Sequence, residues 1–530
     1  ISLLYLSFLQ KKEVPPMKLF ILIFYGLILL LLSIFGAHRY YTMYLFIKHS
    51  RNKVKPKAVF KNLPKVTVQL PIYNEQYVVE RLINAVTQLE YPRKKLEIQV
   101  LDDSTDETSA LAEKICKQKR KEGYTIIYIH RTDRTGFKAG ALENGLKYTD
   151  SEFIAVFDAD FMPNPDFLQK TIHYFTDPTI GMVQTRWDHI NRHYSLLTEC
   201  QSILLDGHFM IEHTARNRSG RFFNFNGTAG VWRRQAIIDG GGWQHDTITE
   251  DLDLSYRSQI SGWKFLYLPD VTVPAELPIE ISAFKAQQFR WAKGSIQVFK
   301  KLYKTILNAQ LPLKIKIESF MHLGANFAYL LMVFLTLLMP VALWVRYYGG
   351  FKKFAYLDLP IFILATLSVI IFYFYTELSI LYHNKNSFDS KFKPLVYLPM
   401  VLAVGIGLSI NNSKAVIEAL FNKKSDFNRT PKYNVASLHR INAVEHVKTL
   451  LKNKYSLHTI NIVSIIEFIL GLYMSLAVYF AFDKNLYVSI PLIMLFQVGY
   501  LYTSLFTIIN SITHHIIVIA NSLRRGVVND

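Results

Sequence analysis

Carboxylate side chains gather at three points in the first half of the chain, within residues 102–103, 158–160 and 250–253. A divalent cation such as Mg²⁺ is usually held by one or two carboxylates together with substrate phosphates. A carboxylate that faces a hydroxyl can instead accept its proton as a general base. Asp158 and Asp160 follow an apolar run, which favours a cation site, although a turn that ends a strand produces the same Asp-Ala-Asp tripeptide.

The third acidic group needs an explanation of its own. Acidic residues such as those at 250–253 are also common in the first turn of a helix, where they favour the macrodipole. Transfer of a sugar from a nucleotide diphosphate needs a Lewis acid for the leaving phosphate and a base for the acceptor hydroxyl. Asp251 is our candidate for that base. Lys138 and Arg134 could neutralise the charge of the diphosphate.

Four apolar segments predict the elements that position these groups, at residues 65–70, 96–101, 125–129 and 153–157. Helical patterns separate them, beginning with an amphipathic helix over residues 76–90. Strands that alternate with helices imply an α/β fold with a mostly parallel sheet covered on both faces. In such sheets ligands bind outside the carboxyl ends of the strands. The first two acidic groups follow strand ends and are therefore expected at one crevice.

A further candidate group lies on a predicted helix that follows the third acidic group. Gln287, Arg290 and Trp291 share one face of this helix by their i, i+3, i+4 spacing. Arginine offers positive charge to a leaving diphosphate, and tryptophan offers a flat face to a sugar ring. An amphipathic helix at the membrane surface, with tryptophan at headgroup depth, accounts for the same residues.

Long apolar runs occupy much of the remaining chain, near residues 19–37, 325–345, 359–382, 459–482 and 486–510. Each is long enough to cross a hydrocarbon core of roughly 30 Å, which needs about 20 residues. The net charge is +19, and lysine and arginine residues flank these runs. That pattern is typical of cytoplasmic loops beside anionic lipid, so we expect a lipid bilayer and no nucleic acid as partner. Two cysteines, Cys116 and Cys200, provide no disulfide framework and fit a reducing compartment.

In order and spacing, the motifs resemble those of processive family-2 glycosyltransferases, which include cellulose, chitin and hyaluronan synthases. The matching residues are Asp102-Asp103, Asp158-Ala-Asp160, Thr249-Glu-Asp251 and Gln287-x-x-Arg290-Trp291. Stretches within residues 99–106, 137–142, 225–232 and 250–254 resemble the plant cellulose-synthase-like A (mannan) and C (glucan) synthases and their bacterial relatives. The resemblance covers residues 60–310, and a more specific match in the membrane part covers 411–432.

The resemblance implies a GT-A domain, Rossmann-like with a mostly parallel sheet, on the cytosolic side of an α-helical transmembrane bundle. Tyr73, Glu75 and Asp103 would bind the base and ribose of a nucleotide sugar. By the same comparison, Asp158 and Asp160 would contact the diphosphate and a Mg²⁺ or Mn²⁺ ion. Asp251 would be the catalytic base, in agreement with the assignment from residue chemistry.

The remaining motifs imply contacts with the diphosphate and the acceptor. Gln287, Arg290 and Trp291 would bind the diphosphate and the acceptor end, beside Lys138. The loop that begins at Phe225 would lie under the acceptor sugar. The acceptor residues expected in this region are Phe225, Gly227, Thr228 and Glu250. The loop carries an extra alanine, Ala229, relative to cellulose synthases, which favours a mannan or non-crystalline glucan product.

The domain boundaries that we expect are, in chain order, an N-terminal segment and anchor (1–47), a basic linker (48–64), the GT-A domain (65–275), interfacial helices with the Gln287 motif (276–320), a transmembrane hairpin (321–382), a cytosolic or interfacial segment (383–457), a second hairpin (458–510) and a tail (511–530). Met17 would be a natural start residue. A cytosolic nucleotide sugar requires a cytosolic catalytic domain, in the inner membrane if the protein is bacterial. Residues 395–421, which include the shorter apolar run at 395–410, are then expected to form a re-entrant or interfacial helix, which gives five spans. A six-span alternative would place the basic loop 422–457 outside.

The leading hypothesis is an inverting hexosyltransferase that polymerises a β-linked glycan from GDP-mannose or UDP-glucose and extrudes it through its own channel. The alternative enzyme adds one sugar to a membrane lipid, as ceramide glucosyltransferases do. A receptor or transporter that only binds nucleotides would not need Asp251. A polymer would need a polar and aromatic path between the spans, for which the candidates are Trp344, Tyr375, Glu377 and Tyr500.

Overall fold

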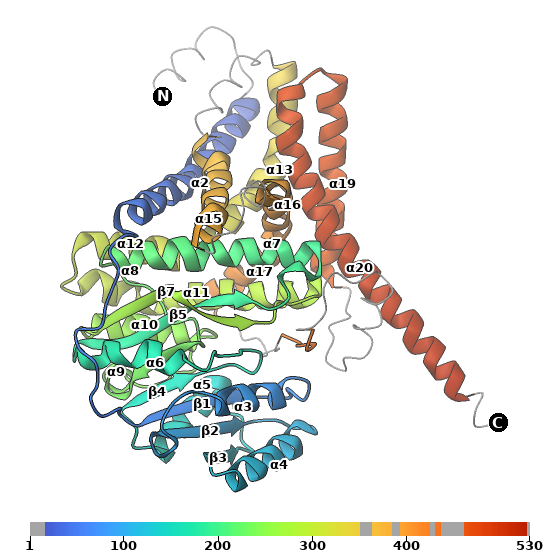
Figure 1. Ribbon diagram of the computed structural model, residues 1–530. Helices are drawn as coiled ribbons and strands as arrows, with labels where there is room; N and C mark the ends of the chain where they lie inside the picture. Colours follow the sequence, from blue (N-terminus) through green and yellow to red (C-terminus); the bar gives the residue numbers. More distant parts are fainter. Residues whose placement is uncertain (1–15, 350–362, 384–392, 424–429, 436–460, 527–530) are drawn as a thin grey trace.

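The computed structural model describes residues 16–349, 363–383, 393–423, 430–435 and 461–526. Within them an α/β domain lies against a bundle of long apolar helices, and helices that run across the bundle separate the two (Figure 1). The segment before the expected start residue and most of the basic segment 422–457 lie outside the described residues.

The α/β domain is built on a seven-stranded sheet with the strand order β3-β2-β1-β4-β6-β5-β7. The strands are β1 (Val66–Ile72), β2 (Leu96–Asp102), β3 (Thr125–His130), β4 (Phe153–Val156), β5 (Ile180–His189), β6 (Gly230–Arg233) and β7 (Lys264–Ala275). Strand β1 pairs in parallel with β2 and β4, and β2 pairs in parallel with β3. Strand β6 runs antiparallel between β4 and β5. The sheet is mixed and mostly parallel, which confirms the predicted α/β class.

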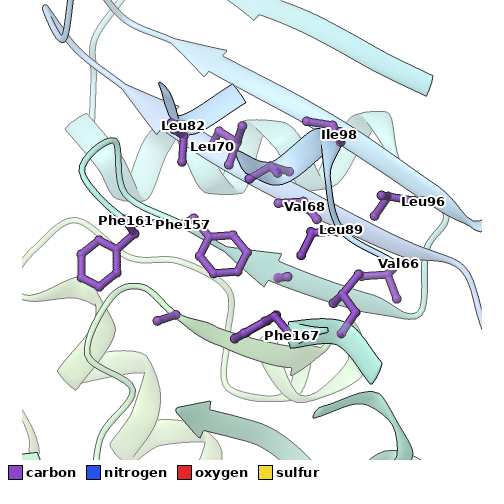
Figure 2. Packing of buried hydrophobic residues seen from close by; sticks show 14 of the residues in the cluster. Val66, Val68, Leu70, Leu82, Leu89, Leu96, Ile98, Phe157, Phe161 and Phe167 are labelled. Atoms are coloured by element: carbon purple, nitrogen blue, oxygen red, sulfur yellow. The ribbon is translucent and has the colours of Figure 1, made fainter. Parts of the chain in front are cut away.

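Strand β1 is buried on both faces. Val66, Val68 and Leu70 are fully buried in the core shown in Figure 2. Thr67 and Gln69, which point to the opposite face, are also fully buried, and their side chains form hydrogen bonds with polar groups of neighbouring elements. Burial on both faces is typical of parallel sheets that are covered by helices on each side. The carboxyl end of β1 is therefore held rigidly where the site begins.

Helices cover the sheet, and several of them begin at or just after motif residues. They include α3 (Val79–Thr87), α4 (Thr108–Lys121), α5 (Phe137–Gly145) and α10 (Glu250–Ile260). The apolar residues of α3 pack in the same core as β1. Helix α10 begins at the third acidic group, so the helix-end explanation considered for that group is geometrically correct. It does not exclude a chemical role, because the same helix end faces a cavity described below.

The layer between the sheet and the bundle is made of helices that cross the bundle (Figure 1). A continuous helical segment consists of α7 (Leu196–Asp206), the π-helical turn η5 (Gly207–His213) and α8 (Thr214–Arg218). Helices α11 (Ile281–Asn308), α12 (Leu313–Leu323) and α17 (Ser409–Leu420) complete the layer. Helix α17 packs along α11 and α13, so segments that are far apart in the sequence lie together in this layer.

Six helices of the described chain are long and apolar enough to cross a membrane. They are Pro16–His49 (α2), Phe327–Tyr348 (α13), Leu364–Leu381 in η7 and α15 (Ser368–His383), Val396–Leu420 in α16 (Lys393–Gly407) and α17, Ile462–Asp483 (α19) and Tyr487–Thr513 in α20 (Ile490–Gly526). This is a multi-pass membrane protein. The fourth candidate differs from the others, because 67% of its apolar window is buried by protein, against 28–39% elsewhere. The five-span count depends on this segment and stays a prediction.

The candidates for a polar path through the bundle do not share one environment. The side chain of Trp344 is half exposed. Tyr500 is fully buried, and its hydroxyl contacts Thr336 and Ser409, each at 2.8 Å. Glu377 is buried in an ion pair with the α/β domain. Tyr375 is partly buried, with its ring edge-on to that of Phe46. These four residues therefore do not by themselves define a path, and the expected channel stays a prediction.

Candidate active site

A cavity of about 230 Å³ opens at the carboxyl ends of β1, β2 and β4. It is bounded on the far side by α11, which lies in the layer beneath the bundle. Most of the residues proposed from sequence line it, namely Tyr73, Glu75, Asp103, Lys138, Asp158, Asp160, Gly227, Glu250, Asp251, Gln287, Arg290 and Trp291. The parallel strands bring these separate segments to one place, because their carboxyl ends meet at the same edge of the sheet.

Two residues expected at the acceptor do not line this cavity. Phe225 is fully buried, with its ring packed edge-on against Trp232 at 5.6 Å between centroids. Thr228 is also fully buried, and its hydroxyl accepts the backbone N–H of Asp158 at 2.9 Å. Direct contact with an acceptor is thus excluded for both in this conformation. Their side chains instead hold the loop whose cavity-lining members are Asn226 and Gly227.

The Asp-Ala-Asp segment is paired with two lysines. Lys138 Nζ lies 2.6 Å from Asp158 Oδ1 and also donates to the carbonyl of Gly227 at 2.9 Å. Lys432 Nζ lies 2.7 Å from Asp160 Oδ2. Burial raises the pKa of Asp158, and Lys138 opposes that rise. Burial disfavours charged Lys138, but Asp158 and Glu250 outweigh it and raise the pKa of the ammonium.

The segment also suits a divalent cation, because two carboxylates plus substrate phosphates satisfy such an ion. No group of three or more histidine, cysteine or carboxylate ligands occurs among the described residues. A cation at Asp158 and Asp160 would consequently depend on the donor's phosphates for its remaining ligands. The two lysines supply positive charge to the same carboxylates.

The expected base lines the same cavity and lies in the first turn of α10. Burial raises the pKa of Asp251 to about 6 and that of Glu250 to about 7. A carboxylate with a pKa near neutrality is suited to accept a proton in the transition state. Asp251 Oδ1 also accepts the N–H of Leu252 at 2.7 Å, which orients the carboxylate.

Asp253 has a different environment from its two neighbours. Its side chain is fully buried and pairs with Arg257 at 2.8 Å and Lys301 at 3.0 Å. It is not among the residues that line the cavity. Asp253 therefore links α10 to α11, and the chemical candidates within this acidic group are Glu250 and Asp251.

Helix α11 places its motif residues on the cavity, as their spacing predicted. Arg290 donates to the hydroxyl of Thr430 at 2.7 Å, and burial lowers the pKa of Arg290 to about 10. The ring of Trp291 lies 6.4 Å from that of Trp187, measured between centroids. The guanidinium can therefore approach a diphosphate, while the two indoles offer apolar faces at the same end of the cavity.

The end of the cavity at which a nucleotide is expected is formed by the loops after β1, β2 and β3. Asp103 receives two hydrogen bonds from Arg131, from Nε at 2.8 Å and from Nη2 at 2.5 Å. The guanidinium of Arg134 lies 3.3 Å from the centroid of the Tyr73 ring. Asp102 is fully buried and accepts from the Tyr128 hydroxyl at 2.7 Å, which makes it a support for the loop.

Several cavity residues were not proposed from the sequence. They are Trp187, Asp188, His189, Asn226, Glu276, Thr430 and Lys432. Thr430 and Lys432 lie in or beside the stretch 411–432 that carried a family resemblance, which was the one signal that could have singled them out. Asn226 lies within the loop expected under the acceptor sugar, although it was not one of the acceptor residues named there. The others lie in segments that carry no recognisable spacing.

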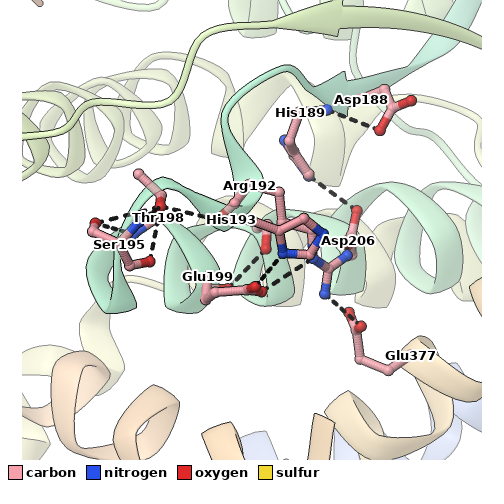
Figure 3. Close-up of polar contacts among 10 residues, drawn as sticks. Asp188, His189, Arg192, His193, Ser195, Thr198, Glu199, Asp206 and Glu377 are labelled. Carbon is pink, nitrogen blue, oxygen red and sulfur yellow. Dashed lines mark hydrogen bonds and ion pairs between the residues drawn. The ribbon is translucent and has the colours of Figure 1, made fainter. Parts of the chain in front are cut away.

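An ionic network joins the membrane side of the cavity to the bundle (Figure 3). Arg192 lies at its centre and donates to Asp206 at 3.0 Å, to Glu377 of α15 at 2.6 Å and to Glu199 at 3.2 Å. His189, which lines the cavity, contacts the other oxygen of Asp206 at 3.0 Å. The wall of the cavity is thus fastened to a membrane helix by buried, charge-assisted hydrogen bonds.

The fold and the site define an α/β domain whose cavity is lined by carboxylates, lysines and arginines. Residues 64–294 match the family model described as "Glycosyltransferase like family 2". The matched region contains all four motif groups and most of the cavity. These residues form a glycosyltransferase domain of family 2, which confirms the resemblance inferred from the motifs.

Similar proteins come from plants. The chain is 45% identical over 252 residues to the probable glucomannan 4-beta-mannosyltransferase 7 of Oryza sativa subsp. japonica, covering 47% of this chain and 43% of that protein. It is 42% identical over 268 residues to glucomannan 4-beta-mannosyltransferase 1 of Cyamopsis tetragonoloba, covering 49% of this chain and 51% of that protein. The chain spans about half the length of the curated relatives it matches.

Among solved structures, the likeness is limited to general shape. The mannosyltransferase of Pyrobaculum calidifontis in complex with GDP-Man and Mn²⁺ is 21% identical, with a TM-score of 0.47. The match covers 75% of this chain and 100% of that chain.

Proposed function

We propose that this chain is a membrane-bound mannosyltransferase that transfers mannose from GDP-mannose to the end of a growing β-1,4-linked glycan. Support for the donor and the linkage comes from relatives that are 41–45% identical and are named as glucomannan 4-beta-mannosyltransferases. Of the two donors considered from the sequence, this favours GDP-mannose over UDP-glucose. The catalytic domain is proposed to face the cytosol, where nucleotide sugars are made.

The observation that carries the proposal is the meeting of Asp251 and Lys138 at Gly227. A Cβ atom at position 227 would lie 2.9 Å from Asp251 Oδ2 and 3.1 Å from Lys138 Nζ. The glycine also has φ +81°, a backbone conformation that other residues rarely adopt. A base and an ammonium group are thereby held close together on the floor of one cavity, where an acceptor hydroxyl and a leaving diphosphate would have to meet.

In the proposed reaction, Asp251 accepts the proton of the acceptor hydroxyl while the hydroxyl oxygen forms a bond to the anomeric carbon. The bond from that carbon to the diphosphate breaks, and the electron pair leaves with the diphosphate. One displacement of this kind inverts the anomeric configuration. Lys138 and Arg290 stabilise the charge that develops on the leaving group.

Asp158 and Asp160 are proposed to hold a Mg²⁺ or Mn²⁺ ion together with the donor's phosphates. When bound, the ion supplies Lewis-acid stabilisation of the diphosphate. Trp291 and Trp187 are proposed to pack against sugar rings, and Glu75 and Tyr73 to contact the nucleotide.

The test uses membranes that contain the full chain and either labelled GDP-mannose or labelled UDP-glucose, with Asp251→Asn membranes as the control. We expect insoluble labelled product from GDP-mannose, and we expect a β-1,4-specific mannanase to release the label. A chloroform-soluble product that carries one sugar would establish the lipid-acceptor alternative. Insoluble product from UDP-glucose alone, digestible by a β-1,4-glucanase, would overturn the choice of mannose.

A further inference from the structure

The floor of the cavity contains one amide side chain held at both of its polar atoms. Asn226 lines the cavity beside Gly227. Its Oδ1 lies 2.6 Å from Nε2 of His213, and its Nδ2 lies 3.1 Å from Nε2 of His208. Both histidines come from η5, a π-helical turn between α7 and α8. Turns of π-helix are rare in proteins, and those that do occur are often located at functional sites.

The orientation of the Asn226 amide determines whether Nε2 of His213 and Nε2 of His208 carry a hydrogen. Because Oδ1 of Asn226 only accepts, His213 must carry its hydrogen on Nε2. Burial lowers the pKa of His213 well below its usual value, so the ring is neutral. Its Nδ1 has no hydrogen-bond partner among the described residues, as expected for an unprotonated nitrogen in an apolar setting. Because Nδ2 of Asn226 only donates, Nε2 of His208 must be unprotonated.

Glu212 determines whether the other ring nitrogen of His208, Nδ1, carries a hydrogen. Nδ1 of His208 lies 3.2 Å from Glu212 Oε2, and Arg216 donates to the same oxygen at 3.2 Å. Burial raises the pKa of Glu212, but Arg216 and His208 outweigh it and hold the pKa well below its usual value. An ionised carboxylate accepts hydrogen bonds only, so Nδ1 of His208 must carry a hydrogen. A reversed Asn226 amide would require a second hydrogen on His208, at Nε2, and would place the hydrogen of neutral His213 on Nδ1, a buried nitrogen without a partner among the described residues.

We propose that His208 and Glu212 are positioning residues for the acceptor. They hold the Asn226 amide in one orientation, which leaves its second Nδ2 hydrogen for a hydroxyl of the acceptor sugar. This inference rests on the proposed function, because it requires an acceptor at the floor of the cavity. Neither His208 nor Glu212 lines the cavity, so both act through Asn226.

The same set of contacts continues to the membrane anchor. Arg216 Nε lies 3.0 Å from Glu318 Oε1, and Glu318 Oε2 lies 3.2 Å from Nε2 of His38 in α2. The side chains of Arg216 and Glu318 are almost fully buried. Charge-assisted contacts of this kind are short and directional, so they restrict movement of Glu212 and hence of the Asn226 amide.

The experiment measures how donor sugar is divided between glycan and water. Membranes that contain the full chain receive labelled GDP-mannose, and we measure total GDP release, label in insoluble glycan, and label in free mannose. For His208→Leu we expect the donor KM to stay within about twofold of wild type and the ratio of glycan to free mannose to fall about tenfold, the effect of losing a hydrogen bond worth roughly 1.4 kcal/mol. His208→Gln places an amide oxygen near the Nε2 position and should recover most of the ratio.

Two further variants make the outcome decisive. Glu212→Gln lets His208 adopt either tautomer and should give an intermediate ratio, which provides a test if His208→Leu fails to fold. His193→Leu removes a histidine that also pairs with a glutamate but lies outside the cavity, and it should match wild type. A wild-type ratio in both His208→Leu and Glu212→Gln would overturn the positioning role. So would equal losses in His208→Leu and His208→Gln. If wild-type membranes release no GDP, it is the proposed function that fails.

Discussion

Lys432 Nζ lies 2.7 Å from Oδ2 of Asp160, although 272 residues separate them in the sequence. This contact brings a residue that follows the membrane-associated helices α16 and α17 to the carboxylates at the end of β4. In water the pair would contribute little, but here Asp160 is 4% exposed and the ammonium is its partner. The end of the cavity at which a cation is proposed is therefore shared between the α/β domain and the membrane part of the chain.

The first prediction concerns this pair. If Lys432 competes with a divalent cation for Asp160, Lys432→Met should tighten Mn²⁺ binding in the absence of nucleotide by about tenfold, the effect of roughly 1.4 kcal/mol. Binding can be measured by titration calorimetry on the purified full chain. Lys423→Met is the matched control, because Lys423 pairs with Glu418 away from the cavity. Unchanged or weaker Mn²⁺ binding in Lys432→Met would contradict the competition.

The second prediction concerns dependence on the cation. Excess EDTA should abolish transfer, and Mg²⁺ or Mn²⁺ should restore it. The reason is that the donor's phosphates require a divalent cation held by Asp158 and Asp160. Asp160→Asn should weaken binding of nucleotide and metal together, since it removes a ligand of the cation. A fluorescent nucleotide and Mn²⁺ titration measure the two affinities. Full turnover in EDTA would rule out this role.

The third prediction concerns Asp251. Replacement by asparagine should preserve nucleotide-sugar binding and reduce transfer by about 10²–10⁴-fold, because the amide cannot accept the hydroxyl proton. A purely helix-end role for the acidic group would instead cause a modest loss of stability with near-normal transfer. If the variant kept more than about a tenth of wild-type turnover, Glu250 would become the candidate base.

The fourth prediction follows from the raised pKa of Asp251. The base must be unprotonated to act, and burial raises its pKa to about 6. Activity should accordingly be full well above pH 6 and should be lost as the pH falls through about 6. The turnover rate at saturating donor, measured across this range, reports the inflection. An inflection near 4, the ordinary range of an exposed carboxyl, would show that the buried acid does not control the rate.

The fifth prediction separates Asp253 from its neighbours. Asp253→Ala removes a fully buried carboxylate from Arg257 and Lys301. Breaking a buried pair typically costs about 3–5 kcal/mol of unfolding free energy, so the melting temperature should fall clearly. The pH inflection of the remaining activity should match wild type, because Asp253 does not line the cavity. A shifted inflection with unchanged thermal stability would place Asp253 in the chemistry instead.

The sequence by itself determined the α/β class and the place of the motif residues. Apolar strands followed by acidic residues are local patterns, and parallel strands necessarily bring their carboxyl ends to one edge. The same reasoning predicted one crevice for Asp103, Asp158 and Asp160, and all three line the cavity. The spacing of Gln287, Arg290 and Trp291 likewise placed them on one helical face, and all three line the cavity.

Only the tertiary structure decided which side chains of the Phe225 loop face the cavity and what the charged groups contact. Phe225 and Thr228 are buried, whereas Asn226 and Gly227 line the cavity. This division arises because the loop packs against the sheet, with Ala229 at φ +54°. Lys432 contacts Asp160 although helices of the membrane part lie between the two residues in the sequence. Contacts of that kind depend on how distant elements pack, and no local periodicity encodes them.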